Sequence, residues 1–414
     1  MIREHDVEKY ARKVGEEVPD WSTDGKVMTV YEVPISKLYY NGENGRIATW
    51  MSGYIAENPD RPLDSLSREE FNDQIEEFII KSNSTESFKR TYNDVLKKGQ
   101  IRPAVVLQDG RVVSGNRRFT VLRRIYADTA DDKFSVLKCF IVKIDINDEE
   151  GRKRIKTIER LTQFGVDEKQ NYDPIDRLVD IYNDLIGDRK IWSVDEYSKK
   201  LNLKKSEVKT MYYKALVMAD YLLFINRKER FDIARALKLD GPAQELAALR
   251  EKMSQSEWNE ARVVFYMHFT ETGDRSREVR EAKRLYSLDR ARFNQLKEKY
   301  FDDIEKHEAG SRTENEQQQN LEDDILGVKE EKLSSKTSVL SDETKNARFQ
   351  IINQTKMEAT RSKRVDELLK AVNTVILYLN DIKFTMKESE ARKLDSQVDK
   401  LLAKIAIYKR DNSA

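Results

Sequence analysis

The sequence predicts an α+β amino-terminal domain, then an all-α half that contains a helix-turn-helix, and finally a helical hairpin or coiled coil. Runs of β-branched and aromatic residues, which favour strands, occur within about the first 150 residues. From 150 to about 305, apolar residues recur at helical spacing and the strand signals stop. We therefore predict four parts: an α+β domain at 1–150, a helical domain at 151–305, a flexible linker at 306–346 and a helical oligomerisation module at 347–414.

The composition narrows the class of protein. Charged residues make up 36% and hydrophobic residues 39% of the 414 residues, and 75 basic residues nearly balance 74 acidic ones. This balance argues against a uniformly basic nucleic-acid binder, so any such function must lie in local patches. One cysteine and three histidines argue against a zinc cluster or a disulfide framework. No apolar stretch has membrane-spanning length and "MIREHDVEKY" is not a signal peptide, so we expect a cytoplasmic protein without membrane contacts.

The first domain carries strand and helix signals in a definite order. The segments are a strand run at 26–40 ending at the turn "NGENGR", a helical stretch at 67–82, a hairpin at 102–115 and a strand at 134–145. Asp109 and Gly110 form the turn of the hairpin. The single cysteine, Cys139, lies in the last apolar run and is expected to be a buried strand residue.

The stretch "VVSGNRRFTVLRR" at 112–124 predicts an anion site. A glycine ends a strand run, and Arg117 and Arg118 then fall on the first turn of a helix. The amide groups and the dipole of a helix start favour an anion, and guanidinium groups are suited to phosphate. The alternative is a strand-to-helix turn whose arginines face solvent.

A helix pair is predicted at about 193–217. Ser193 and Glu196 form a capping box that begins the first helix, and Asn202 falls at the tight turn. The second helix exposes residue types that suit phosphate and base-edge contacts in duplex DNA, with Lys204 adding charge at its start. These residues are Lys205, Ser206, Lys209, Thr210, Tyr213 and Lys214. A plain helical hairpin with a solvated lysine face is the alternative.

Two amphipathic helices close the chain. Their apolar positions are Val365, Leu368, Leu369, Val372, Ile376 and Leu379 in one helix, and Leu394, Val398, Leu401, Leu402, Ile405 and Tyr408 in the other. Two helices alone bury little surface. We therefore expect them to pair with a second copy and form a homodimer. Docking onto the same chain or onto another protein partner is the alternative.

The first half of the chain, from about 30 to 235, resembles the ParB family. That family has an Asn-Pro-type turn with a nearby Arg, a Gly-x-x-x-Pro segment, a Gly-Glu-Arg-Arg helix start and a Glu-Asn-Leu-Gln-Arg segment before a helix that opens near a proline. The matching segments here are Asn41 to Arg46, Gly99 with Pro103, Gly115 to Arg118, and Glu159 to Gln163 followed by Pro174.

The resemblance implies a pocket for CTP or another nucleoside triphosphate held with Mg²⁺. It places Arg117 and Arg118 beside phosphate and Glu159 near the metal. The remaining residues that it assigns to the nucleotide are Asn44, Arg46, Gly115, Asn116 and Arg160. Asn116 stands where the family has Glu, and Arg160 where it has Asn. An arginine cannot ligate magnesium, so Arg160 would replace the cation electrostatically or the site would not hydrolyse its nucleotide.

The resemblance also leaves an enzyme open, because sulfiredoxins and a family of free-serine kinases share this fold. Glu43 in "NGENGR" is then a candidate catalytic base, and Glu159 is a further catalytic candidate; the alternative for Glu43 is an exposed turn residue. We predict a nucleotide-responsive, ParB-like DNA-binding protein with slow or absent turnover, acting in partition, a mobile element or anti-phage defence. The rivals are a kinase or nuclease that uses its helical half for targeting, and an interaction protein with a degenerate pocket.

Overall fold

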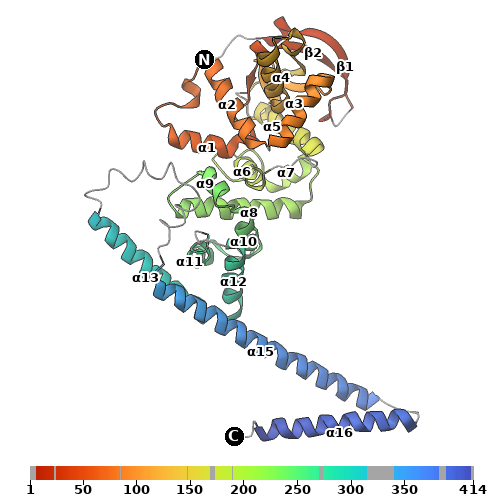
Figure 1. Ribbon diagram of the computed structural model, residues 1–414, viewed down its shortest axis with the longest axis vertical. Helices are drawn as coiled ribbons and strands as arrows, with labels where there is room; N and C mark the ends of the chain where they lie inside the picture. Colours follow the sequence, from red (N-terminus) through yellow and green to blue (C-terminus); the bar gives the residue numbers. More distant parts are fainter. Residues whose placement is uncertain are drawn as a thin grey trace. The chain divides into compact units, whose positions relative to one another are not determined.

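The computed structural model describes residues 6–22, 25–83, 85–146, 148–167, 173–188, 190–269, 274–314, 340–381 and 388–411 (Figure 1). The chain divides into two compact units, Met1–Phe349 and Gln350–Ala414. None of the described helices is both long and apolar enough to cross a membrane.

A six-stranded mixed sheet forms the centre of the first domain. Its strands are β1 (Arg12–Glu17), β2 (Met28–Pro34), β3 (Tyr39–Tyr40), β4 (Ala104–Leu107), β5 (Arg111–Ser114) and β6 (Val136–Val142), in the spatial order β1-β2-β6-β4-β5-β3. The pairs β4–β6 and β3–β5 are parallel and the others are antiparallel. The sheet confirms the predicted α+β class for this domain.

Two features of the sheet differ from the prediction. The expected strand at 26–40 is two strands, because a 3₁₀ helix at Ile35–Lys37 follows Pro34, which has no N–H group to continue a ladder. The edge strand β1 was not predicted, because its side chains are mostly exposed and lack apolar alternation. The hairpin of β4 and β5 forms as expected, with Gly110 at a φ of 95° in its turn.

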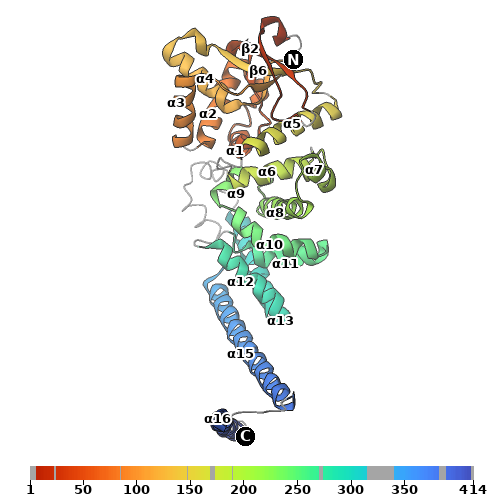
Figure 2. The ribbon, with the colours of Figure 1, turned by 90° about the vertical axis from the view of Figure 1, so that its right-hand side faces the viewer.

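Helices cover both faces of the sheet (Figure 2). They are α2 (Arg68–Ser82), α3 (Thr85–Lys98), α4 (Asn116–Thr129) and α5 (Glu149–Asp167), while α1 (Ala48–Glu57) packs against α2. Along β4, Ala104 and Val106 join the core formed with α2, α3 and α4, while Val105 and Leu107 pack with Ile158 of α5 on the other face. Cys139 is fully buried in the first of these cores, as predicted.

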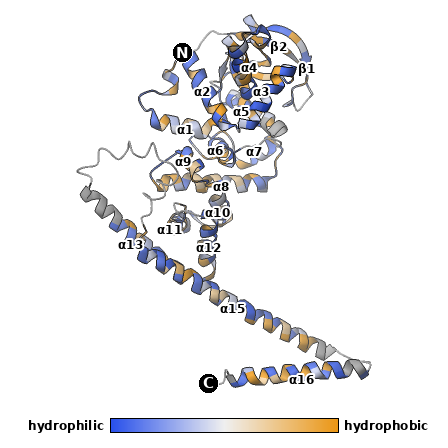
Figure 3. Cartoon of the chain, in the orientation of Figure 1, coloured by the Kyte–Doolittle hydropathy of each residue, from blue (hydrophilic) through white to orange (hydrophobic). Residues whose placement is uncertain are grey.

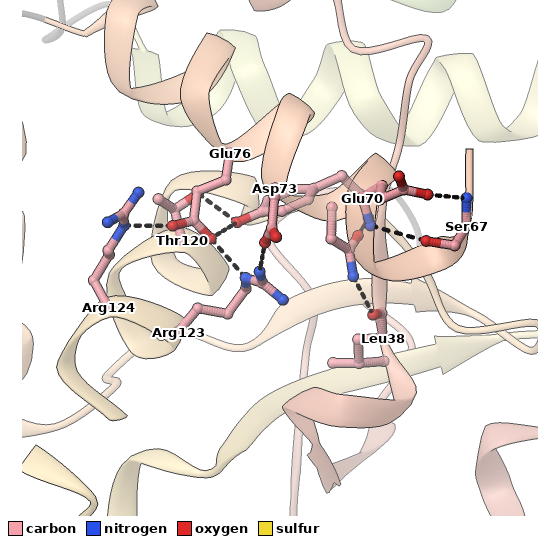
Figure 4. A network of polar contacts seen from close by, with 10 residues as sticks. Leu38, Ser67, Glu70, Asp73, Glu76, Thr120, Arg123 and Arg124 are labelled. Atoms are coloured by element: carbon pink, nitrogen blue, oxygen red, sulfur yellow. Dashed lines mark hydrogen bonds and ion pairs between the residues drawn. The ribbon is translucent and has the colours of Figure 1, made fainter. Parts of the chain in front are cut away.

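A buried polar network fixes α4 against α2 (Figure 4). The carboxylate of Glu76, which is 5% exposed, accepts from Arg123 at 2.6 Å and also pairs with Arg124. The hydroxyl of Tyr40 lies 2.8 Å from that of Thr120 and 3.4 Å from Glu76. Because α4 is held at its middle by these contacts, the position of its amino-terminal end is fixed.

The described residues from 173 to 314 form helices, as the sequence predicts. They are α6 (Pro174–Leu185), α7 (Val194–Lys200), α8 (Lys205–Phe224), α9 (Phe231–Ala236), α10 (Asp240–Lys252), α11 (Gln255–Tyr266), α12 (Arg275–Leu288) and α13 (Arg290–Glu314). An aromatic core joins α8 to α11, where the buried rings of Tyr221 and Tyr266 meet edge to face. Asp220 accepts from Trp258 and Tyr266 in the same core.

Two helices extend into the range that was predicted as a linker. α13 continues to Glu314 and α15 (Asp342–Asp381) begins before residue 346, whereas 315–339 lie outside the described residues. The second unit contains most of α15 together with α16 (Glu388–Asp411). Figure 3 shows apolar residues along both helices. The exposed apolar side chains include Val365, Leu368, Leu369, Val372, Ile376, Leu394, Leu401, Leu402, Ile405 and Tyr408. The side chain of Leu379 lies outside the described part.

Candidate functional site

The start of α4 combines a glycine in the left-handed conformation with the amino-terminal amides of a helix. Gly115 caps α4 with a φ of 96°, and a Cβ there would lie 2.8 Å from the Cβ of Ala104. Both the left-handed conformation and the close approach to β4 therefore require glycine. The amides of the first turn of a helix have no intrahelical acceptor, and they form a ready anion site.

A cavity of about 420 Å³ lies at this helix start, which is within the usual size range of small-molecule sites. It brings together residues from three distant segments that the sequence assigned to a nucleotide. They are Asn44, Arg46, Gly115, Asn116, Arg117, Arg118 and Glu159. Gly99 and Pro103 also line the cavity. Two candidates, Glu43 and Arg160, are not in the lining.

Part of the wall was missed by the sequence reasoning. It includes Glu17 at the end of β1, then Val18, Asp20 and Trp21, and three residues of α3 (Thr91, Asp94 and Val95). These residues carry no recognisable motif. Only the folding of β1 and α3 around the strand ends brings them to the cavity.

The side chains of Glu159 and Asn116 each bury an oxygen in this region. Glu159 is 1% exposed and Asn116 6%. Among the described residues, Oε1 of Glu159 and Oδ1 of Asn116 have no hydrogen-bond partner. Leaving a buried acceptor unpaired costs about 1–3 kcal/mol, so both oxygens are suited to receive a ligand group.

Lys156 occupies the other oxygen of Glu159. Its ammonium lies 3.3 Å from Oε2 of Glu159 and donates to the backbone carbonyl of Glu43 at 2.9 Å. Burial alone would lower the pKa of Lys156, but the neighbouring carboxylate of Glu159 raises it overall. Lys156 therefore carries a positive charge at neutral pH.

The residues present do not fit a magnesium ion that neutralises Glu159, because an ammonium already does so. Magnesium in proteins takes oxygen ligands, typically one or two carboxylates completed by substrate phosphates and water. Here the ammonium of Lys156 is already bound to Glu159. Within the described parts of the chain, no group of three His, Cys, Asp or Glu side chains could hold a metal ion.

The two arginines after Gly115 have different surroundings. The guanidinium of Arg118 donates to the carbonyls of Arg102 and Pro103, the latter at 3.2 Å, and so holds the segment before β4 against α4. Arg117 is half-buried and lines the cavity. Both arginines therefore line the cavity, and the guanidinium of Arg118 also anchors its wall.

Arg160 belongs to an ion-pair network and not to the cavity lining. Its guanidinium, 1% exposed, lies 2.9 Å from Asp180 and 2.8 Å from Asp184 of α6. The expectation that Arg160 acts beside the nucleotide in place of the cation does not agree with this placement. Glu43 is an exposed turn residue whose carbonyl, and not its carboxylate, receives the described contact from Lys156.

The loop that carries Asn44 and Arg46 rests directly on α6. Oδ1 of Asn44 accepts from the amide of Arg46 at 3.1 Å and caps a 3₁₀ helix at Gly45–Ile47. A Cβ on Gly45 would lie 1.8 Å from an oxygen of Asp180, so only glycine fits there. α6 also packs against α8, and it thus supports both the cavity loop and that helix.

Asp176 joins α6 to α1 and α9. It accepts from the hydroxyl of Thr49 at 2.9 Å and pairs with Arg235 at 2.5 Å. Burial raises the pKa of Asp176 to about 7, although the charge of Arg235 opposes the shift.

The helices α7 and α8 have the local features expected of the helix pair. Ser193 and Glu196 form the capping box at the start of α7, and Asn202 has a φ of 52° in the turn. The amide of Leu203 donates to the carbonyl of Ser198 at 2.9 Å, which closes the turn. Five of the residues proposed to contact DNA are exposed: Lys204, Lys205, Ser206, Lys209 and Thr210.

The lysines of α8 are paired to different degrees. Lys205 lies 2.6 Å from Asp195 and Lys209 lies 3.4 Å from Glu251, but all four side chains are well exposed. Such surface pairs contribute little and exchange easily for phosphate. Lys214 pairs with Asp240 at 2.5 Å and is only 13% exposed, so it is held within the helical domain. Tyr213 is half-buried against Tyr212, at 5.3 Å between ring centroids.

No protein-family model matches the chain, and no curated protein matches it. The structure is similar to a solved structure of the C-terminally truncated chromosome-partitioning protein ParB from Caulobacter crescentus, complexed with CTP-gamma-S. That similarity has a TM-score of 0.19 and 12% identity, and it covers 54% of this chain and 99% of the other.

Proposed function

We propose that this protein binds a nucleoside triphosphate of the CTP type at the start of α4 and binds duplex DNA through α7 and α8. One observation carries the proposal. Residues from the 44–46 loop, the start of α4 and the middle of α5 line a single cavity. The set combines helix-terminal amides with Arg46 and Arg117, which are the groups that recognise phosphate.

The nucleotide acts as a conformational ligand. Its phosphates meet the amides that follow Gly115 and the guanidinium of Arg117, while Arg118 keeps the 102–103 segment in place. Turnover is slow or absent, because the buried carboxylate of Glu159 is paired with Lys156 and Glu43 lies outside the lining. This placement of Glu43 favours binding over the kinase alternative.

DNA is bound through the exposed amino-terminal half of α8. Lys205, Ser206, Lys209 and Thr210 offer donors for phosphates and base edges in the major groove. The first domain contacts the helical domain through α6, because both the 44–46 loop and α8 pack on that helix. A ligand that shifts the loop thereby biases the position of α8.

The chain acts as a homodimer joined through α15 and α16. Their apolar side chains are exposed, with Leu368 at 61% and Leu402 at 58%. Exposed apolar surface of this extent indicates an interaction surface. Two copies double the DNA contacts, and the role lies in partition, a mobile element or defence.

Calorimetric titration with ATP, GTP, CTP and UTP tests the nucleotide site. The Arg117→Ala variant should lose about ten- to hundredfold in affinity, the usual effect of removing a charge-assisted contact. Arg90→Ala, which removes an exposed arginine from α3, is the matched control and should bind like the parent. Failure of the parent to bind any of the four at millimolar concentration would refute the proposal.

A further inference from the structure

The ammonium of Lys156 joins Glu159, a buried carboxylate of the cavity lining, to the loop that holds Glu43. Lys156 contacts Oε2 of Glu159 at 3.3 Å and the carbonyl of Glu43 at 2.9 Å. Its side chain is 15% exposed and that of Glu159 only 2%. Glu43 is followed directly in the sequence by Asn44, and both Asn44 and Arg46 line the cavity. The ammonium of Lys156 is therefore held in place beside the carboxylate of Glu159.

A buried carboxylate in an anion site has to be neutralised before a triphosphate can approach. The repulsion between like charges is strong where water is excluded, so a cation must lie close to Glu159. A divalent metal can supply that charge when it bridges carboxylate and phosphates. In this chain the ammonium of Lys156 already supplies the positive charge beside Glu159, and its two contacts hold it in place.

We propose that Lys156 takes the place of the divalent cation, so that the nucleotide binds without Mg²⁺. This inference rests on the proposed nucleotide site. Lys156 is a positioning residue that acts through Glu159. Oε1 of Glu159 and Oδ1 of Asn116 then remain as acceptors for hydroxyl or amino groups of the ligand.

Titration of the full chain with CTP, once with excess MgCl₂ and once with EDTA, tests the inference. The parent should give the same Kd in both. Lys156→Met should bind roughly tenfold or more weakly in EDTA, since it leaves the Glu159 charge uncompensated, and Mg²⁺ should restore much of the affinity. Lys156→Arg should keep metal-free binding. The double variant Lys156→Met/Glu159→Gln should recover binding in EDTA, which a merely structural lysine would not explain.

If the parent binds CTP tenfold or more weakly in EDTA than in MgCl₂, this inference is overturned and the proposed function stays intact. Absence of binding under both conditions would overturn both. If Lys156→Met does not fold, the comparison of the parent with and without Mg²⁺ decides alone.

Discussion

Arg160 of α5 lies 2.8 Å from Asp184 of α6 and directly follows Glu159, which lines the cavity. Two successive residues of α5 therefore contact different parts of the structure. Glu159 lines the cavity, and Arg160 holds two carboxylates of α6, on which the 44–46 loop also rests. The cavity loop is therefore supported by an ion-pair network whose residues lie outside the cavity lining.

Replacing Arg160 should destabilise the protein. Arg160→Met leaves Asp180 and Asp184 buried without their cation, so the free energy of unfolding should fall by about 3–5 kcal/mol. Arg117→Met is the matched control and should change it by less than about 1 kcal/mol, since that side chain is only half-buried. Urea unfolding followed by circular dichroism measures both. Equal effects of the two substitutions would refute the structural role of Arg160.

Reversing charge on α8 should abolish DNA binding. Lys205→Glu/Lys209→Glu removes two of the proposed phosphate contacts and should reduce the salt slope of any residual binding by about two units. Lys89→Glu/Lys97→Glu makes the same charge change on exposed positions of α3 and should have little effect. Fluorescence anisotropy with a panel of duplexes at several salt concentrations measures the result. Undiminished binding by the α8 variant would exclude this helix as the contact.

Charges on the apolar faces of α15 and α16 should dissociate the dimer. Leu368→Glu/Leu401→Glu places carboxylates at positions that are 61% and 46% exposed in the single chain. In a paired helix these positions would be buried, where an unpaired charge is costly. Lys370→Glu/Lys400→Glu changes polar positions of the same helices and should leave a dimer. Sedimentation equilibrium distinguishes the two outcomes, and a parent that is itself monomeric would contradict the assignment.

The buried carboxyl of Asp176 should make stability depend on pH. Burial raises its pKa from 3.8 to about 7. A group whose pKa is higher in the folded state stabilises below its unfolded pKa, and that stabilisation is lost as the pH rises from about 4 to 7. Relative to Asp176→Asn, the parent should lose up to about 1.4 kcal/mol per pH unit in this window. Urea unfolding of both proteins at several pH values measures the difference in their free energies of unfolding. A difference that stays constant between about pH 4 and 7 would contradict the prediction.

Local signals in the sequence predicted much of the fold. The hairpin followed from Asp109 and Gly110, because the turn and its strands are adjacent in the chain. The edge strand β1 was missed because Arg12–Glu17 is largely exposed and carries no alternation. The α7–α8 pair followed from caps and spacing that act within a few residues.

The candidate site was predictable only in part. The segments at Asn44, Gly115 and Glu159 could be assigned through a resemblance, and all three line the cavity. The partners of Arg160 lie 20 and 24 residues further along the chain, and Lys156 reaches a carbonyl 113 residues earlier. Neither pairing leaves a pattern in the sequence, because only tertiary packing brings the groups together.

Hydrogen exchange with and without CTP, followed by mass spectrometry, tests the central claim most directly. Saturating CTP should slow exchange in peptides that contain the amides of 115–118, and also in those that cover 43–46 and 99–103. The Arg117→Ala variant should lose this protection at the same nucleotide concentration. CTP that binds while leaving the exchange of residues 115–118 unchanged would contradict the assignment of the nucleotide to the start of α4.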